Sequence, residues 1–268
     1  MENRIVQSFK KLQTTNRRAF IPYVMGGDPD LATSLQILHT LANNGADIIE
    51  LGFAFSDPTA DGNVIQMAHE RVLKSRINLP DILELIIEFR KENQHTPIVL
   101  MGYLNPILAM GIEKFTAKVK QAQVDGVLVV DLSLEDSIKF TATLAKNNII
   151  NIYFITPTTS EERIKNIVKL AKGYIYYISV KGITGATDFD VLTVKREVAS
   201  IEQHTDLPIA IGFGIKDIDT IQALENCGHA VIVGSTIVSL IDQYNYDKNK
   251  ILSELTDITQ KFSQSLIR

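Results

Sequence analysis

The chain of 268 residues contains no tryptophan and only one cysteine, Cys227. A single cysteine excludes an internal disulfide and any zinc site that needs several thiolates. The five histidines are scattered without the spacing of metal ligands, so we expect no metal site. The net charge is −4 and no basic stripe runs along the sequence, which argues against binding to nucleic acid.

Long apolar runs are also missing. No stretch reaches the roughly 20 residues of a membrane span. The first residues include Glu2 and Arg4 rather than the apolar core of a signal peptide. We therefore expect a soluble, cytoplasmic protein. Hydrophobic residues make up 45% of the chain, and its length suits a single domain over residues 1–268.

Short apolar runs alternate regularly with helical patterns. The expected strands are 19–25, 47–51, 97–101, 126–130, 149–154, 174–179, 208–212 and 230–233. The expected helices are 2–13, 31–43, 63–75, 80–93, a helical region to about 123, 134–146, 161–171, 190–203, 217–226 and 248–265. Such alternation is typical of a parallel sheet covered by helices.

Eight β-α units in this length predict the (β/α)8 TIM barrel, here with an extra N-terminal helix and additional helices in the loops. The alternative is a doubly wound open sheet, which would carry a Gly-x-Gly-x-x-Gly turn after its first strand. The turn Gly26-Gly27-Asp28-Pro29 does not have that pattern. In a barrel, residues at the C-terminal ends of the strands converge on one pocket.

Two acids stand out at these strand ends. Glu50 lies in the last positions of an apolar run, and Asp61 follows in the next loop. A buried carboxylate is costly unless it is paired or used, and burial would raise the pKa of Glu50. The pair suits general acid–base catalysis. The structural alternative is an ion pair at Glu50 and a helix cap at Asp61; Asp57 is better explained as a turn former.

Glycines mark the ends of strands seven and eight. Gly212 and Gly214 surround the first of these turns, and Gly234 and Ser235 form the second. Backbone N–H groups at helix N-termini bind anions, and phosphate lies near these two loops in many barrels. Tight turns alone would also explain them, but together they predict a phosphate site. Gly185, in the sixth loop, would add a third wall.

Apolar and aromatic residues also occur at the strand ends and would form a flat slot for an aromatic ring: Tyr23, Met101, Leu128, Phe154, Tyr176 and Phe213. Each is singly more typical of ordinary core. Lys181 is the one lysine placed for Schiff-base chemistry, which borohydride trapping would test.

Several motifs occur in a characteristic order: Phe20-Ile21-Pro22-Tyr23-Val24, Gly27-Asp28-Pro29, Glu50-Leu51-Gly52, Phe55-Ser56-Asp57-Pro58, Ala60-Asp61-Gly62, Gly182-Ile183-Thr184-Gly185, Gly212-Phe213-Gly214 and Gly234-Ser235. In these the chain resembles the tryptophan synthase alpha subunit family along its whole length. The resemblance implies reversible retro-aldol cleavage of indole-3-glycerol phosphate to indole and glyceraldehyde 3-phosphate.

The resemblance also implies a role for each site residue. Glu50 would be the acid–base group at indole C3, and Asp61 would bind the indole N–H. The remaining roles are phosphate binding by Gly185, Gly214, Gly234 and Ser235, indole binding by Tyr23, Met101, Leu128, Tyr176 and Phe213, and closure of the sixth loop by Thr184. The chain departs from the usual family pattern at Ala54, Ser133 and Val180.

A partner is implied as well. The family's alpha subunit works with a beta subunit that carries pyridoxal phosphate, in an alpha2beta2 tetramer, while the alpha chain itself needs no cofactor. The loop around Asp57 and the region after Asp131 match the surfaces that meet the partner. Alternatives are a stand-alone lyase, a catalytically weak regulatory subunit, or another phosphate-binding barrel such as an indole-glycerol-phosphate synthase or a phosphosugar epimerase. A synthase of that kind would want catalytic lysines, and an epimerase would want paired acids or metal-binding histidines. Neither set is evident in the sequence.

Overall fold

The computed structural model describes residues 2–179, 190–212, 214–215, 217–244 and 247–267. Nine strands occur in these ranges: β1 (Ala19–Met25), β2 (Ile49–Gly52), β3 (Ile98–Gly102), β4 (Gly126–Val129), β5 (Ile150–Asn151), β6 (Tyr153–Ile155), β7 (Ile175–Ile178), β8 (Ile209–Gly212) and β9 (Ala230–Val233). The sequence-based strands all correspond to these, with ends that differ by one or two residues.

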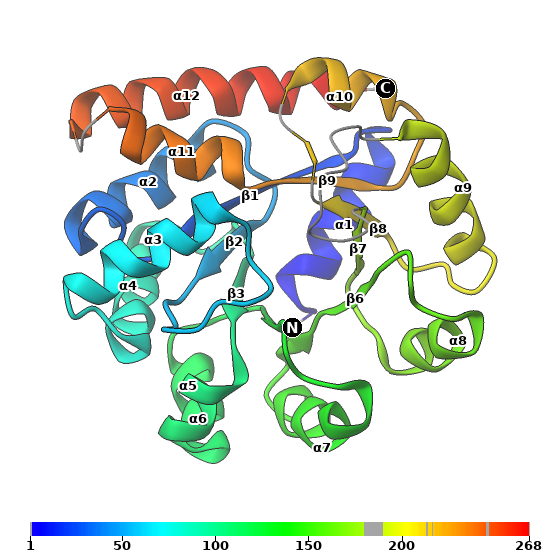
Figure 1. The fold of residues 1–268 in the computed structure, drawn as a ribbon, viewed down its shortest axis with the longest axis horizontal. Coiled ribbons are helices and arrows are strands. Elements are labelled where there is room, and N and C mark those ends of the chain that lie inside the picture. The colour runs from blue at the N-terminus through cyan, green and yellow to red at the C-terminus, as the bar shows by residue number, and fades with distance from the viewer. Residues whose placement is uncertain (1, 180–189, 213, 216, 245–246, 268) are drawn as a thin grey trace.

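Helices surround the strands (Figure 1). They are α1 (Arg4–Thr14), α2 (Leu31–Asn43), α3 (Asn63–Lys74), α4 (Leu79–Glu92), α5 (Leu104–Met110), α6 (Ile112–Gln121), α7 (Leu134–Ala145), α8 (Glu161–Leu170), α9 (Val191–Glu202), α10 (Ile218–Ala223), α11 (Ser235–Gln243) and α12 (Lys248–Ser265). The helix α11 has no counterpart among the expected helices, and α10 is shorter than the expected helix 217–226.

The sheet closes into a barrel. Its strands are parallel and follow the order β5-β4-β3-β2-β1-β9-β8-β7-β6. A single residue, Ile152, separates β5 from β6, and its N–H donates to the carbonyl oxygen of Val127 at 2.8 Å. β5 and β6 are therefore one barrel strand, which pairs with β4 on one side and β7 on the other. This confirms the eight-stranded TIM barrel.

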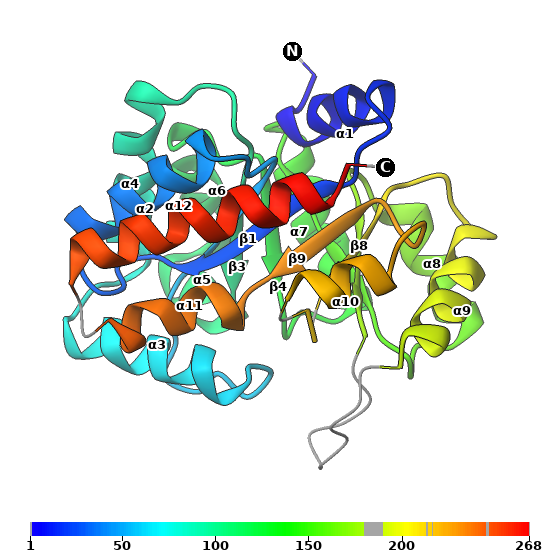
Figure 2. The ribbon, with the colours of Figure 1, turned by 90° about the horizontal axis from the view of Figure 1, so that it is seen from above.

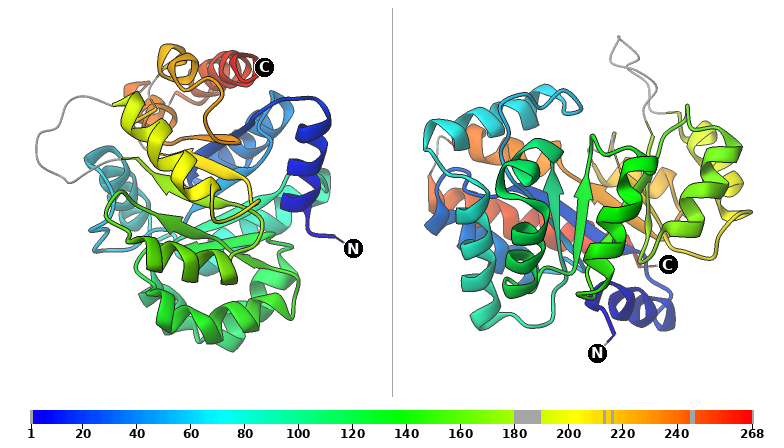
Figure 3. Two further views of the ribbon diagram at one scale, coloured as in Figure 1. Left: turned by 90° about the vertical axis from the view of Figure 1, so that its right-hand side faces the viewer. Right: turned by 90° about the horizontal axis from the view of Figure 1, so that it is seen from below.

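The core has two parts. One cluster lies between the strands and the outer helices, and the other fills the barrel. Ile5, Phe9 and Leu12, on one face of α1, belong to the second cluster. The extra N-terminal helix thus closes the N-terminal end of the barrel, while α3 lies at the opposite end (Figures 2 and 3).

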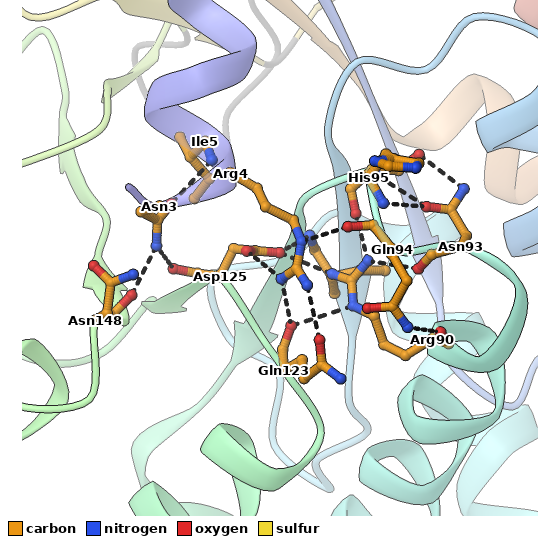
Figure 4. A network of polar contacts seen from close by, with 12 residues as sticks. Asn3, Arg4, Ile5, Arg90, Asn93, Gln94, His95, Gln123, Asp125 and Asn148 are labelled. Carbon is orange, nitrogen blue, oxygen red and sulfur yellow. Dashed lines mark hydrogen bonds and ion pairs between the residues drawn. The ribbon is translucent and has the colours of Figure 1, made fainter. Parts of the chain in front are cut away.

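A buried polar network fastens α1 to the barrel (Figure 4). The carboxylate of Asp125, just before β4, accepts from Arg4 Nη1 at 2.9 Å and from Arg90 Nη2 at 2.8 Å. Asn3 caps α1 by accepting from the Ile5 N–H, and its amide donates to the carbonyl oxygens of Asp125 and Asn148. Four segments that are separate in the sequence, around residues 3–4, 90, 125 and 148, are joined at this end.

Candidate active site

Glu50 lies inside the barrel wall, on β2. It is paired in register with Tyr23 of β1 and Val99 of β3, and its side chain is fully buried. Oε1 accepts a hydrogen bond of 2.8 Å from the hydroxyl of Tyr174. Among the described residues, Oε2 has no hydrogen-bond partner. The ion pair that the structural alternative required for Glu50 is therefore not present among these residues.

Burial governs the acidity of this group. It raises the pKa of Glu50 from its ordinary value of 4.5 to about 8, and the hydrogen bond from Tyr174 opposes the shift. A carboxyl with this pKa is largely protonated at neutral pH. It can donate a proton and take one back, as an acid–base catalyst must.

Asp61 lies in the loop between β2 and α3. Its carboxylate oxygen Oδ2 accepts from the Tyr103 hydroxyl at 2.7 Å and lies 3.2 Å from Nε2 of His69. The side chain is mostly shielded, with 13% exposed. Gly62, not Asp61, is the N-cap residue of α3, and it makes no side-chain cap. Asp61 is thus held by side chains rather than used as the cap of α3.

The two acids share aromatic neighbours. The pKa of Tyr23 is raised first by burial and then by the negative charges of Asp61 and Glu50. Burial raises the pKa of Tyr176 as well, and the charges of Glu50 and Asp61 add to the effect. The carboxyl groups of β2 and of the following loop therefore act on the same two tyrosines, and the four side chains gather at one end of the barrel.

Leu128 and Met101, which were also predicted to line the slot for an aromatic ring, lie on different strands. Leu128 on β4 is buried in the cluster that fills the barrel, and Met101 on β3 packs against both clusters. Gly212 leaves the space that the Tyr176 ring occupies, because a Cβ there would lie 2.5 Å from Cε1 of that ring. The aromatic side of the pocket therefore depends on a residue without a side chain.

Of the two expected phosphate turns, the one at Gly234 lies beside Tyr23. Gly214 adopts a φ of +81°, a conformation that favours glycine. Gly234 precedes α11, which begins at Ser235, and a Cβ on Gly234 would lie 3.6 Å from Cβ of Tyr23. The positive end of a nine-residue helix thus lies next to the aromatic wall, an arrangement that suits an anion. Phe213, Gly185, Thr184 and Lys181 lie outside the described residues.

Three residues of this site were not identified from the sequence. Tyr174 lies two residues before Tyr176, so strand alternation places both on the same face, and this signal could have found it. His69 and Tyr103 contact Asp61 from α3 and from the end of β3. No local pattern marks them, because these contacts depend on how the elements pack.

Two cavities lined by described residues lie elsewhere. One of about 930 Å³ lies under α1 at the N-terminal end, and one of about 300 Å³ lies beside α7 and α8. Among the described residues, no group of three or more His, Cys, Asp or Glu side chains is arranged to hold a metal ion. The helices of the described ranges include none that combines the length and apolar character of a membrane span.

Comparison with known proteins gives consistent matches. The family model described as tryptophan synthase alpha chain matches residues 9–267. The tryptophan synthase alpha chain of Nitrosomonas europaea is 45% identical over 240 residues, which are 90% of this chain and 87% of that protein. The solved alpha subunit of Legionella pneumophila has a TM-score of 0.91 at 33% identity and covers 99% of both chains. A chain of the tryptophan synthase a2b2 complex of Pyrococcus furiosus has a TM-score of 0.83 at 33% identity, covering 91% of this chain and 98% of that chain.

Proposed function

We propose that Glu50 and Asp61 carry out the chemistry of this chain, which belongs to the tryptophan synthase alpha chain family and catalyses its lyase step, retro-aldol cleavage of indole-3-glycerol phosphate. The observation that supports the proposal most is the environment of Glu50. It is a fully buried carboxyl with a pKa near 8, and it shares two tyrosine neighbours with a second acid.

In this proposal Glu50 cycles through both protonation states. The protonated carboxyl gives its proton to indole C3, and the carboxylate that forms takes the proton of the side-chain hydroxyl as the carbon–carbon bond breaks. Indole and glyceraldehyde 3-phosphate result, and Glu50 is protonated again. Oε2 is the oxygen proposed for these transfers, because Oε1 is held by Tyr174.

Asp61 would stabilise the intermediate. Protonation at C3 places positive charge on the indole ring, which a carboxylate at the ring N–H stabilises. Tyr23, Met101, Leu128, Tyr176 and Phe213 are proposed to hold the ring. The phosphate is proposed to bind at Gly185, Gly214, Gly234 and Ser235, and Thr184 to help close the sixth loop. The position of the α11 N-terminus beside Tyr23 supports this orientation of the substrate.

Glu50→Gln and Asp61→Asn test the catalytic assignment, by release of indole from indole-3-glycerol phosphate. Each should lower kcat at least ~100-fold, the low end for loss of a general acid–base group. Asp57→Asn is the matched control, since this acid lies in the same loop but is exposed, and it should retain the wild-type rate without a partner. A Glu50→Gln rate within a few-fold of wild type would overturn the assignment.

We further propose that residues 1–268 form one barrel domain, which works in the cytoplasm and itself uses no cofactor. Its proposed partner is a beta subunit that contains pyridoxal phosphate, and the two form an alpha2beta2 tetramer. Asp131 accepts from the N–H of Leu104, which joins the loop after β4 to α5. Leu108 on α5 and Ile138 on α7 are each about half exposed. These features support a docking surface near Asp57 and Asp131.

Adding a beta subunit separates the partnership from the stand-alone alternative. We expect beta to stimulate indole release and to form a complex by size-exclusion chromatography. A chain that is fully active alone and indifferent to beta would be a stand-alone lyase.

A further inference from the structure

Two side chains outside the proposed chemistry hold the carboxylate of Asp61. His69 comes from α3, and Tyr103 directly follows β3. Nε2 of His69 and the hydroxyl of Tyr103 contact the same carboxylate oxygen, Oδ2, at 3.2 Å and 2.7 Å. Within the described part of the chain, no hydrogen bond reaches Oδ1. The protein therefore fixes one oxygen of the carboxylate and leaves the other, Oδ1, free of hydrogen bonds from the described residues.

The loop itself directs both donors. Nδ1 of His69 accepts the N–H of Phe55 at 3.0 Å, so the neutral ring carries its proton on Nε2, next to Asp61. The Tyr103 oxygen accepts the N–H of Ala60 at 3.1 Å, which directs its own proton to Asp61. Two backbone amides of the loop thus orient the two side chains that hold its acid.

Packing keeps this arrangement in place. His69 and Tyr103 are each 2% exposed. The Tyr103 ring contacts the rings of Phe55 and His69, with centroids 5.2 Å and 6.0 Å apart. Burial, and next the hydrogen bond to Asp61, raise the pKa of Tyr103, so its hydroxyl keeps the proton that it donates.

The helix that carries His69 is also fixed. Arg71, two residues further along α3, forms a bidentate ion pair with the fully buried Asp28, at 3.0 Å and 2.6 Å. Asp28 lies in the turn after β1, so α3 is tied to the barrel independently of Asp61.

We propose that His69 and Tyr103 are positioning residues, which hold Asp61 by Oδ2 and so direct Oδ1 at the indole N–H. The inference rests on the proposed role of Asp61. A carboxylate held by two donors on one oxygen cannot rotate freely, and an acceptor that is already oriented stabilises charge in the transition state without reorganisation.

Two amide substitutions separate the two contacts of His69. In His69→Gln, the amide nitrogen reaches about as far as Nε2, so the variant retains a donor for Asp61. In His69→Asn, the amide oxygen lies about where Nδ1 was, so the variant retains only the acceptor for Phe55. Tyr103→Phe removes the second donor to Oδ2 and preserves the ring.

The experiment measures kcat and KM for indole release, with thermal unfolding of each variant. We expect His69→Asn and Tyr103→Phe to lower kcat about tenfold each, the loss of one charge-assisted hydrogen bond, with a smaller change in KM. His69→Gln should stay within about threefold of wild type. In an Asp61→Asn background, His69→Asn should cause no further loss, because it acts through Asp61.

Each outcome decides between the proposals. Equal losses in His69→Gln and His69→Asn, or additive losses with Asp61→Asn, would show that His69 is merely structural. Wild-type rates in both His69→Asn and Tyr103→Phe, with Asp61→Asn inactive, would overturn the positioning role alone. An active Asp61→Asn would instead overturn the role proposed for Asp61.

Discussion

At the scale of single residues, environment separates the two acids. Glu50 is inside the barrel wall with one hydrogen bond, whereas Asp61 lies in a loop and accepts from two side chains on one oxygen. Burial raises the pKa of Glu50 to about 8, although the hydrogen bond from Tyr174 opposes the shift. Two carboxyl groups placed in different environments can serve as proton donor and charge stabiliser in one site.

The absence of a side chain at Gly212 is important for the packing of the Tyr176 ring. Because the Tyr176 ring fills the space above this residue, Gly212→Ala would force the ring or the strand to move. Overpacking of this kind costs about 1–3 kcal/mol. We expect a higher KM for indole-3-glycerol phosphate together with a lower free energy of unfolding, measured by steady-state kinetics and urea denaturation.

Gly62→Ala is the control for this change. A Cβ at Gly62 would meet no atom within 4 Å, and its φ of −76° suits any residue. Its free energy of unfolding should stay within about 0.5 kcal/mol of wild type. Equal stability of the two alanine variants would contradict the packing argument at Gly212.

At the scale of elements, cap residues made several helix boundaries predictable. Asp30 and Ser160 cap α2 and α8, whose first residues match the sequence analysis. Ser133 caps α7 by accepting from the Asp136 N–H. β2 begins two residues later than expected, because the N–H groups of Asp47 and Ile48 both donate to the carbonyl oxygen of Phe20 and do not follow the regular ladder.

The network that fastens α1 to the barrel is centred on the carboxylate of Asp125, which binds both Arg4 and Arg90. Arg90 is 2% exposed, and burial lowers its pKa to about 10, although Asp125 opposes the shift. Asp125→Ala would leave this cation buried without a carboxylate, which costs about 3–5 kcal/mol. Urea denaturation should therefore show a large loss of stability, with kcat unchanged where the fold is intact, since Glu50 is on another part of the barrel.

Arg4→Ala gives the matched comparison. Arg4 binds the same carboxylate but is 23% exposed, so its loss should cost no more than about 1 kcal/mol. Equal losses in the free energy of unfolding of Asp125→Ala and Arg4→Ala would show that the buried pair of Arg90 and Asp125 does not fasten the N-terminal end of the barrel.

At the scale of the whole molecule, regular alternation was enough to predict the barrel, because eight β-α units of this length have few other arrangements. The same topology predicted that Glu50 and Asp61 would meet at the C-terminal strand ends. The helix α11 was harder to find, since its apolar, β-branched start at Thr236, Ile237 and Val238 also suits a strand.

Contacts between distant elements could not be predicted. Tyr174 meets Glu50 across the barrel, 124 residues away in the sequence, and Tyr103 meets Asp61 from 42 residues away. Strand alternation could place Tyr174 on the same face as Tyr176, but no local signal pairs it with Glu50, or Tyr103 with Asp61. They depend on the closure of the sheet and on the packing of the loop after β2.

Burial in the barrel keeps a proton on Glu50 at neutral pH, and the catalytic role proposed for Glu50 depends on that proton. Titration of the protein labelled with ¹³C at its glutamate carboxyl carbons, followed by NMR, measures this pKa, and Glu50→Gln identifies the resonance by its absence. We expect a midpoint near pH 8, so that Glu50 is protonated below this pH and charged above it. A midpoint near the ordinary value of 4.5 would contradict it.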